Sequence, residues 1–361
     1  MKILIIGFAK IKYMPYLNLY LDNIDANEND VHVLYWQRDN SADEPLPENL
    51  TQHVFKAEMS DEIPKFRKIG FFAEFTRTAG KLIKKEKFDF IIVLTSVPAV
   101  LLSGILLLKY KNRYIYDYRD YTFEKNAVYK KVVAKLVENS KFTVYSSEKH
   151  LDFLPKSEKL YLAHNFVNAA LEHKINKKMI AGENNPIRLS YWGIVRNGEF
   201  NREVIKKLAN DKRFEVVFHG RKQQTAINLE NYCKENKIEN IRFAGEYRED
   251  DRYKFAEETD IIYNLYSVSG TEGMAMGNKF YDGIIFKIPQ ICTKGSFMGE
   301  KAEEYGVGKA LDPSSETFAD DIYNYYVNLE VGVFNFNCDK ALEKIKHDNE
   351  KTAEIIKASC E

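Results

Sequence analysis

A glycine-rich loop that leads into a lysine-bearing helix is the segment of this sequence best suited to chemistry. It spans residues 269–283 and reads SGTEGMAMGNKFYDG, with Gly273 and Gly277 ahead of Asn278 and Lys279. Free N–H groups at a helix N-terminus bind anions, and a lysine there adds a full positive charge. The segment therefore predicts an anion site, and the alternative is an ordinary helix capped by Asn278.

Asp282 follows Asn278 by one helical turn, so the two side chains are expected on the same face. A carboxylate at that distance from a bound diphosphate would suit ribose hydroxyls better than phosphates. The segment as a whole therefore indicates a nucleoside diphosphate.

Glycine and charged residues follow several apolar runs in the second half of the chain. Glycine lets a ligand approach the backbone closely, and arginine pairs with phosphate oxygens through two hydrogen bonds. The alternative is that the glycines only end strands and the arginines are solvated. These positions are Gly193 with Arg196, Gly220 with Arg221, and Gly245 with Glu246.

The elements that must position these residues alternate between short apolar runs and helical periods. Strands are expected at residues 2–7, 31–36, 53–57, 90–95, 114–118, 142–146, 160–164, 187–193, 215–220, 240–245, 260–265 and 289–293. Helices are expected at residues 73–87, 97–109, 128–138, 202–210, 226–235, 250–258, 278–286, 317–329 and 339–359.

This alternation predicts an α/β protein with parallel sheets and crossover helices. A polar segment at 168–186 divides it into a domain of residues 1–166 and a domain of residues 167–338, both doubly wound and Rossmann-like. The final helix, 339–361, is expected to pack back on the first domain. Two such domains facing each other enclose a central cleft, with ligands at the carboxyl ends of the strands.

Composition narrows the class of protein. The 53 basic and 53 acidic residues cancel, which argues against a nucleic-acid partner, and four scattered cysteines suit a reducing cytoplasm. No signal peptide is expected at the N-terminus. The apolar run at 90–108 is interrupted by Thr95, Ser96 and Pro98, so a buried strand and helix is favoured over a membrane span.

Charge is unevenly distributed behind the neutral total. Residues 1–63 carry 5 basic and 11 acidic residues, whereas residues 64–156 carry 19 basic and 9 acidic residues. Basic residues interleave with phenylalanines at 64–87 and recur at 125–135. This pattern favours contact with an anionic membrane surface, and the alternative is a solvated helix whose phenylalanines face the core.

Four segments, in order, resemble the motifs of GT-B glycosyltransferases of the family 4 type. The run NKFYDG at 278–283, followed by Ile288 and Pro289, resembles the family's donor-loop signature. In the first half, YDYRD at 116–120, YSSE at 145–148 and HNFVN at 164–168 resemble its successive strand ends. The resemblance covers roughly residues 1–330 and implies the GT-B fold.

The resemblance also implies roles for individual residues. Arg196 and Lys279 would hold the donor diphosphate, and Asp282 would take the place of the family's ribose-binding glutamate. Arg119 and Asp120 would face the cleft near the transferred sugar and, with Lys279, form the catalytic set. Donor-side residues would be Gly193, Arg196, Gly220, Arg221, Glu246, Gly273, Gly277, Asn278, Lys279 and Asp282, and acceptor-side residues Gly7, Tyr13 and Glu272.

The function so implied is the metal-independent, retaining transfer of a hexose from a nucleotide-sugar to a glycan. The nucleotide-sugar is expected to be of the UDP type. The acceptor is expected to be a lipid-linked precursor of a cell-surface polysaccharide, reached from the cytoplasm at the inner face of the membrane. No separate cofactor, metal or nucleic acid is expected. Two alternatives stay open: a nucleotide-sugar epimerase, and a non-catalytic partner subunit, since Met274 stands where the family often has glutamate.

Overall fold

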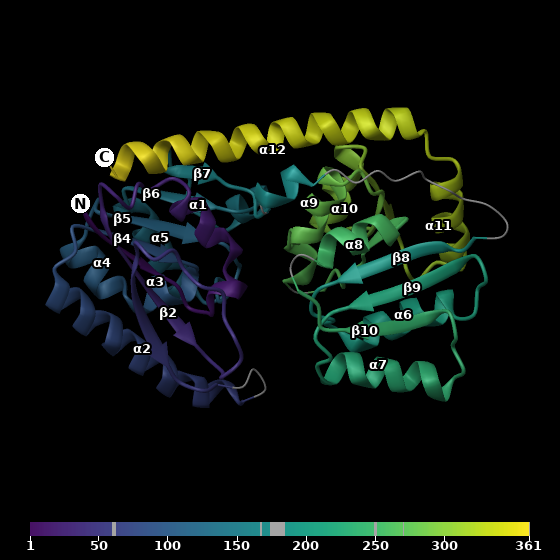
Figure 1. Ribbon diagram of the computed structural model, residues 1–361, viewed down its shortest axis with the longest axis horizontal. Coiled ribbons are helices and arrows are strands. Elements are labelled where there is room, and N and C mark those ends of the chain that lie inside the picture. The colour runs from purple at the N-terminus through teal and green to yellow at the C-terminus, as the bar shows by residue number, and fades with distance from the viewer. Residues whose placement is uncertain (60–62, 167, 174–184, 249–250, 270, 361) are drawn as a thin grey trace. The chain divides into compact units, whose positions relative to one another are not determined.

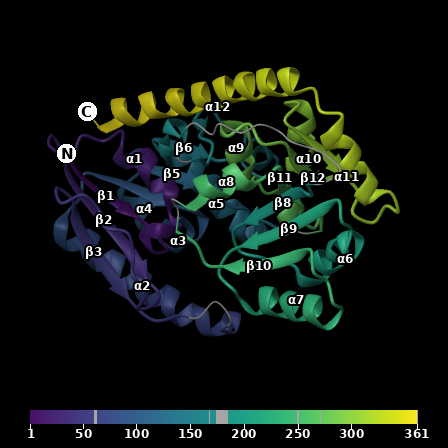
Figure 2. The same cartoon turned by 45° about the vertical axis from the view of Figure 1, so that its right-hand side comes forward.

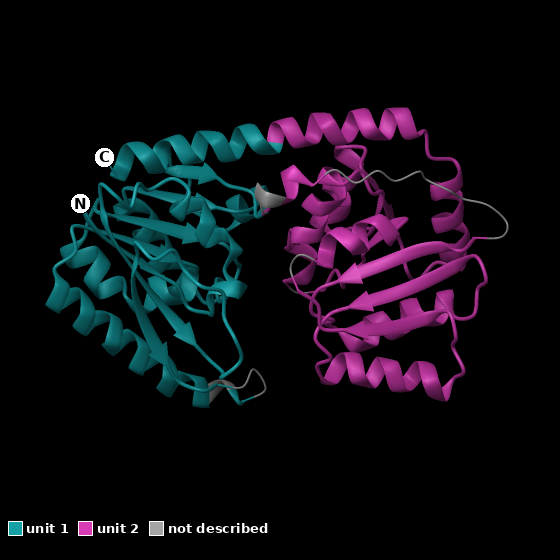
Figure 3. Ribbon diagram, viewed as in Figure 1, with its two compact units in different colours: residues 1–165, 345–361 teal, residues 166–344 magenta. Residues whose placement is uncertain are grey.

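The computed structural model describes residues 1–59, 63–166, 168–173, 185–248, 251–269 and 271–360. The chain forms two compact units: unit 1 comprises residues 1–165 and 345–361, and unit 2 comprises residues 166–344 (Figure 3). Most of the polar segment at 168–186, and Val167 in the HNFVN motif, lie outside the described residues.

Unit 1 is built on a parallel sheet of seven strands (Figure 1). The strands are β1 (Lys2–Ile6), β2 (Asp30–Gln37), β3 (Thr51–Lys56), β4 (Phe90–Leu94), β5 (Tyr114–Tyr118), β6 (Phe142–Tyr145) and β7 (Leu160–Leu162). Their order is β3-β2-β1-β4-β5-β6-β7. The chain therefore runs outward from β1 to one edge and then returns to build the other side, which places the topological switch point between β1 and β4.

Both faces of this sheet are buried, because alternate residues of each strand point to opposite sides. Leu4 and Ile6 pack with helices α2 (Lys65–Glu86), α3 (Ser96–Leu101), α4 (Ser103–Lys109) and α5 (Ala127–Asn139). Ile3 and Ile5 pack on the other face with α1 (Asn18–Leu21) and the end of α12 (Val331–Cys360). Within unit 1, Thr352 of α12 donates a hydrogen bond of 2.6 Å to the carbonyl of Leu162.

Unit 2 has a parallel sheet of six strands. These are β8 (Ile187–Trp192), β9 (Phe214–His219), β10 (Ile241–Gly245), β11 (Ile261–Asn264), β12 (Gln290–Thr293) and β13 (Gly308–Leu311), in the order β10-β9-β8-β11-β12-β13. This is the doubly wound dinucleotide-fold order, and its switch point lies between β8 and β11.

Two helical layers cover the sheet of unit 2 (Figure 2). Helices α6 (Gly198–Leu208), α7 (Gln224–Glu235) and α11 (Phe318–Val327) pack on the face that carries Leu189 and Tyr191. Helices α8 (Asp251–Glu258) and α9 (Asn278–Ile285) pack on the face that carries Trp192 and Ile262. Helix α10 (Phe297–Glu304) contacts β12 and β13. The prediction of two doubly wound parallel-sheet domains is confirmed.

The structure differs from the sequence prediction at several elements, and helix α12 begins at Val331, eight residues before the predicted start at 339. Helix α2 begins at Lys65, eight residues before the predicted start, and the helix predicted at 97–109 is divided at Leu102 into α3 and α4. The apolar run at 90–108 is therefore a strand and two short helices. Strand β13 and helix α10 were not predicted, because the short run GKAL lacks β-branched residues and the run FMGEKAEE of α10 contains a glycine and few apolar residues.

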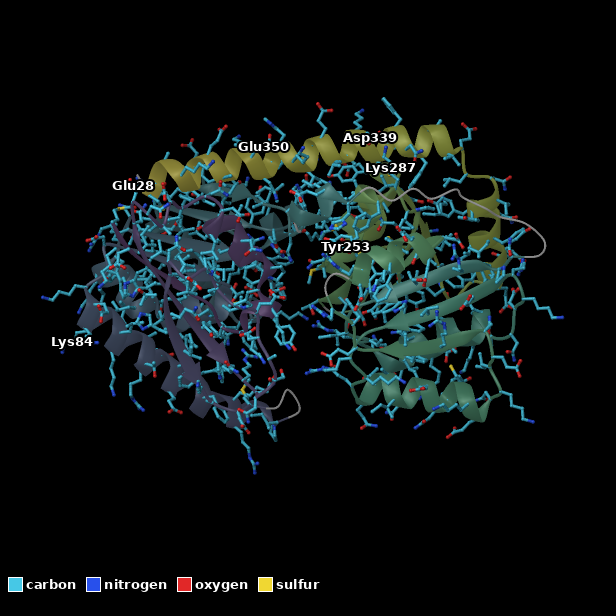
Figure 4. All side chains as sticks on the ribbon, in the orientation of Figure 1. Glu28, Lys84, Tyr253, Lys287, Asp339 and Glu350 are labelled. Carbon is cyan, nitrogen blue, oxygen red and sulfur yellow. The ribbon has the colours of Figure 1, made fainter. Side chains whose placement is uncertain are left out.

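The basic segment that contains α2 turns its described phenylalanines inward. Phe75 lies in the core of unit 1, and Phe71 and Phe72 pack against it beside Trp36. The basic side chains of Arg67, Arg77, Lys81, Lys84 and Lys85 are exposed, and Figure 4 shows Lys84 directed away from the ribbon. Within the described residues, no helix is both long enough and apolar enough to span a membrane.

Candidate functional site

A small depression opens at the switch point of unit 2, where β8 and β11 lie side by side and their connections leave in opposite directions. Its walls come from the segments that follow these two strands and from the first turn of α6. The lining residues are Tyr191, Arg196, Asn197, Phe200, Asn201, Leu265, Tyr266, Ser267 and Glu272. A doubly wound sheet binds ligands at this place, so the depression is the candidate site.

The glycines at the ends of β8 and β9 bring two backbones into contact at this edge. A Cβ atom at Gly220 would lie 1.9 Å from the carbonyl oxygen of Gly193, and Gly193 itself has φ +135°, which side-chain-bearing residues rarely adopt. The amide of Gly193 donates to the carbonyl of His219 at 2.9 Å, and that of Gly220 donates to Gly245 at 2.8 Å. These glycines are therefore required by the backbone geometry beside the depression.

Lys279 carries the buried amine of this edge. It lies in the first turn of α9 and is 5% exposed. Its Nζ donates a hydrogen bond of 2.6 Å to the hydroxyl of Tyr266 and lies 3.3 Å from the ring centroid of Tyr191. The N-cap position is Gly277 rather than Asn278. Because glycine has no side chain to cap the helix, the first turn is not closed by its own N-cap residue.

Burial lowers the pKa of Lys279 well below the usual lysine value, and the nearby charge of Asp282 offsets this only in part. Burial likewise raises the pKa of Tyr191 to about 12 and raises that of Tyr266 well above the usual tyrosine value. Both tyrosine hydroxyls therefore keep their protons near neutral pH. An incoming anion would favour the charged form of the lysine.

The basic residue that lines the depression is Arg196, whose side chain is exposed. Its backbone carbonyl accepts a hydrogen bond of 2.7 Å from the Asn201 amide, and the oxygen of that amide accepts one of 2.8 Å from Tyr263. A buried tyrosine thus fixes the loop that carries Arg196. The guanidinium itself stays at the surface, where a ligand can reach it.

Asp282 faces away from the tyrosine-lined side of the depression. It is 3% exposed, accepts a hydrogen bond of 2.9 Å from the Trp192 indole, and forms an ion pair of 3.5 Å with Arg252. These contacts join α9 to β8 and α8. Its proposed binding to ribose stays a prediction.

The other donor-side residues lie around the same sheet edge. Gly273 is buried, and a Cβ atom there would lie 2.6 Å from the carbonyl oxygen of Val268, so this position too requires glycine. Arg221 and Glu246 are exposed after β9 and β10. Glu272, assigned to the acceptor side from the sequence, lines the depression of unit 2 together with Arg196.

In unit 1, the predicted catalytic pair divides into a buried and an exposed residue. Arg119 is 6% exposed, lies 2.5 Å from the Asp117 carboxylate and donates to the carbonyl of Ala163 at 3.1 Å. Asp120, the next residue, is exposed. The positions of these side chains make Arg119 a residue that holds the end of β5 and leave Asp120 accessible to a ligand of unit 1.

The two remaining acceptor-side positions, Gly7 and Tyr13, belong to the segment after β1. Gly7 is buried, and a Cβ atom there would lie 2.5 Å from the sulfur of Met14, a flexible neighbour. Tyr13 is 48% exposed, with the Lys12 ammonium 5.2 Å from its ring centroid. The two residues lie beside the switch point of the unit 1 sheet.

His150 gives unit 1 a dependence on pH that can be measured. It is buried beside the Tyr118 ring, and burial with the charge of Arg119 lowers its pKa from 6.5 to about 4. Between pH 6.5 and about pH 4, the histidine is therefore protonated more often in the unfolded state than in the folded state. The contribution of His150 to the free energy of unfolding is complete above pH 6.5 and falls as the pH drops. We expect unit 1 to lose about 2 kcal/mol between pH 7 and pH 5.

Urea unfolding at the two pH values measures this loss. In the Trp192→Phe background the only tryptophan is Trp36, which is buried in unit 1 and reports on that unit alone. His150→Phe should remove about 2 kcal/mol of the pH dependence, whereas His347→Gln, which changes an exposed histidine, should leave it unchanged. If the free energy of unfolding of His150→Phe depended on pH as strongly as that of the parent protein, His150 would not be the source of the pH dependence.

Sequence reasoning missed the two tyrosines that enclose Lys279. Tyr191 and Tyr266 belong to or follow apolar strands, where aromatic residues are usually core residues. Their positions one to three residues from strand ends were the available indication, because such positions reach the ligand-binding edge. Trp192 of β8, which donates to Asp282, was missed for the same reason, and Arg252 was missed because nothing in the sequence of α8 sets it apart from other arginines on helices.

Comparison with known proteins places the architecture among glycosyltransferases. No family model and no curated protein matches the sequence. Sucrose-phosphate synthase from Thermosynechococcus elongatus superposes with a TM-score of 0.75 at 11% identity, over 98% of each chain. HepE from Anabaena, in complex with UDP and glucose, gives 0.71 at 15% identity over 99% of each chain.

WaaG, a glycosyltransferase involved in lipopolysaccharide biosynthesis, gives a TM-score of 0.65 at 12% identity over 99% of each chain. Identities this low show the fold alone. The present chain therefore has the GT-B fold, and its similar structures include enzymes solved with a nucleotide or a nucleotide-sugar.

Proposed function

We propose that this protein is a glycosyltransferase that moves a sugar from a nucleotide-sugar on unit 2 to a glycan acceptor on unit 1. The observation that carries the proposal is the buried amine of Lys279, which lies against Tyr191 and Tyr266 at the switch point of unit 2, where the exposed Arg196 also lines the depression. A lysine amine and a guanidinium at the edge of a doubly wound sheet suit a diphosphate.

The same residues suit the chemistry of transfer. As the glycosidic bond of the donor breaks, negative charge develops on the departing nucleoside diphosphate. Positive groups fixed in advance around that charge stabilise the transition state more than the ground state. Lys279 and Arg196 supply this charge from the protein, so we propose transfer without a metal ion. The family 4-like motifs extend the proposal to a retaining mechanism.

For the donor we propose a UDP-linked hexose. The support is that the structurally similar HepE was solved with UDP, with UDP and glucose, and with UDP-glucose. Asp282 is proposed to contact the ribose, Asp120 to lie near the transferred sugar, and the strand-end glycines to let the donor approach the backbone.

For the acceptor we propose a lipid-linked precursor of a cell-surface polysaccharide, met at the inner face of the membrane by a cytoplasmic enzyme. The support is the exposed basic face of α2, with the exposed Lys125, Lys130 and Lys131 near the start of α5. Each well-placed basic residue contributes about 1 kcal/mol of attraction to anionic lipid. Because the described phenylalanines of α2 pack inward, this attraction would be mainly electrostatic.

Titration calorimetry with UDP, GDP, ADP, CDP and dTDP tests the proposal. One of these nucleoside diphosphates should bind at least about tenfold more tightly than the others. Failure of all five to bind would contradict a nucleotide-sugar site. The matching nucleotide-sugar is then incubated without acceptor. A transferase hydrolyses the nucleotide-sugar slowly at most, whereas an epimerase converts it to another nucleotide-sugar. When acceptor glycans are then added, a transferase forms a glycosylated product and a non-catalytic subunit forms none.

A further inference from the structure

The amine of Lys279 is enclosed by two aromatic residues that come from different strands. Its Nζ lies 3.3 Å from the centroid of Tyr191 and 4.9 Å from that of Tyr266, and it donates to the Tyr266 hydroxyl at 2.6 Å. In the part of the chain that the structure describes, no carboxylate pairs directly with this amine. A tyrosine hydroxyl therefore takes the place that a carboxylate usually occupies beside a buried lysine.

Both tyrosines are themselves held in place. The backbone amide of Tyr266 donates to the Thr293 hydroxyl at the end of β12 at 2.9 Å, which fixes the segment after β11. The Tyr191 hydroxyl donates to the carbonyl of Ile194 at 2.5 Å, which fixes its ring at the end of β8. The enclosure thus spans the three strands β8, β11 and β12.

Charged and titratable groups around the amine come from each element packed against it. Asp282 of α9 favours the charged amine, but its carboxylate is engaged by Trp192 and Arg252. Cys292 of β12 carries a thiol whose pKa burial raises to well above the usual value, so it stays neutral. Arg196 and burial both disfavour a charge on the lysine.

We propose that Tyr266 is a positioning residue for Lys279, and that it holds the lysine amine so that a nucleoside diphosphate binds there with uptake of one proton. This inference rests on the proposed function. The proton passes from solvent or buffer to the lone pair of Nζ, and the resulting ammonium donates to phosphate oxygen. The Tyr266 hydroxyl accepts a hydrogen bond from the amine in both states and stabilises the charged one.

Proton uptake is measured by titrating UDP into the full chain in buffers of different ionisation enthalpy. Between about pH 7.5 and pH 9.5 the terminal phosphate of UDP is already ionised, so protons taken up belong to the protein. We expect the wild-type protein to take up protons on binding within this range and its affinity to fall as the pH rises. Lys279→Arg, which stays charged throughout, should bind UDP without this uptake.

Tyr266→Phe keeps the ring and removes the hydroxyl. We expect it to bind UDP about tenfold more weakly and to begin losing affinity at lower pH, because the ammonium has lost an acceptor. In the Lys279→Met background the same change should have little further effect, since Tyr266 acts through the lysine. The matched control is Tyr114→Phe, which removes a buried hydroxyl that donates to Leu136 in unit 1.

The outcomes separate the inference from the proposed function. If wild-type protein binds no nucleoside diphosphate, the proposed function fails before Tyr266 is tested. If UDP binds without proton uptake, or if Tyr266→Phe weakens binding with an unchanged pH profile, the inference is overturned while the function stands. Should Tyr266→Phe fail to fold, the comparison of wild type with Lys279→Arg still decides whether the lysine takes up a proton.

Discussion

Replacing Lys279 by alanine is expected to lower the affinity for nucleoside diphosphates by roughly 100-fold. The amine is buried at the switch point of unit 2, and once protonated in the complex its hydrogen bonds to phosphate would be charge-assisted and largely shielded from water. Alanine removes that charge and leaves the rings of Tyr191 and Tyr266 facing a gap. Titration calorimetry with UDP and with pyrophosphate measures the loss, which should be similar for both ligands because the lysine is expected to contact the diphosphate.

The matched control is Lys287→Ala. Lys287 lies just beyond the other end of α9, is exposed, and pairs with Asp339 at 2.8 Å (Figure 4). The Lys287→Ala variant loses a lysine side chain from the same unit but outside the depression. Its affinity for UDP should therefore stay within a factor of about two of wild type. Equal binding by wild type and Lys279→Ala would remove the lysine from the donor site and with it the observation on which the proposed function depends.

Replacing Asp282 by alanine is expected to destabilise unit 2 by about 3–5 kcal/mol. Asp282 is buried, and its ion-pair partner Arg252 is 6% exposed. Removing the carboxylate leaves a buried guanidinium without this charge partner and takes the acceptor from the Trp192 indole. Urea unfolding followed by Trp192 fluorescence in the Trp36→Phe background reports on unit 2 directly.

Asp339→Ala is the control, because it removes an exposed carboxylate from a surface ion pair of the same unit and should cost less than about 1 kcal/mol. The ribose prediction is tested separately with Asp282→Asn, which keeps an oxygen for the indole. We expect that variant to lose more affinity for UDP than for pyrophosphate. Equal losses for the two ligands would make Asp282 a residue that holds α9 and does not contact the nucleotide.

The elements of the two sheets were largely predictable because strand and helix periodicity is a local property of the chain. The run ILII of β1 after Lys2 and the run FIIVL of β4 are continuously apolar, as strands buried on both faces must be. Edge and short elements carry less of this pattern. Strand β13 has one buried side chain in four, and α10 contains a glycine and few apolar residues, so neither is distinct from a loop in the sequence.

The candidate site was only half predictable. Lys279, Arg196 and the glycines could be singled out because their residue types have few structural uses at strand ends and helix starts. The partners of Lys279 could not, because Tyr191 and Tyr266 are 75 residues apart in the chain and become neighbours only when β8 and β11 pair. The Asp282 side chain points toward Trp192 and Arg252 and not toward the two tyrosines, and this orientation depends on how α9 lies across the sheet.

The sequence by itself determined the alternation of strands and helices, the two-domain plan and the phosphate-suited residues, because these follow from periodicity and side-chain chemistry along short stretches. Only the tertiary structure decided which of these residues meet, which are buried and what each one faces. A lysine three residues from an aspartate is an ion-pair candidate in the sequence. In the folded sheet the lysine reaches past the edge to two tyrosines while the aspartate is turned toward a buried tryptophan and arginine.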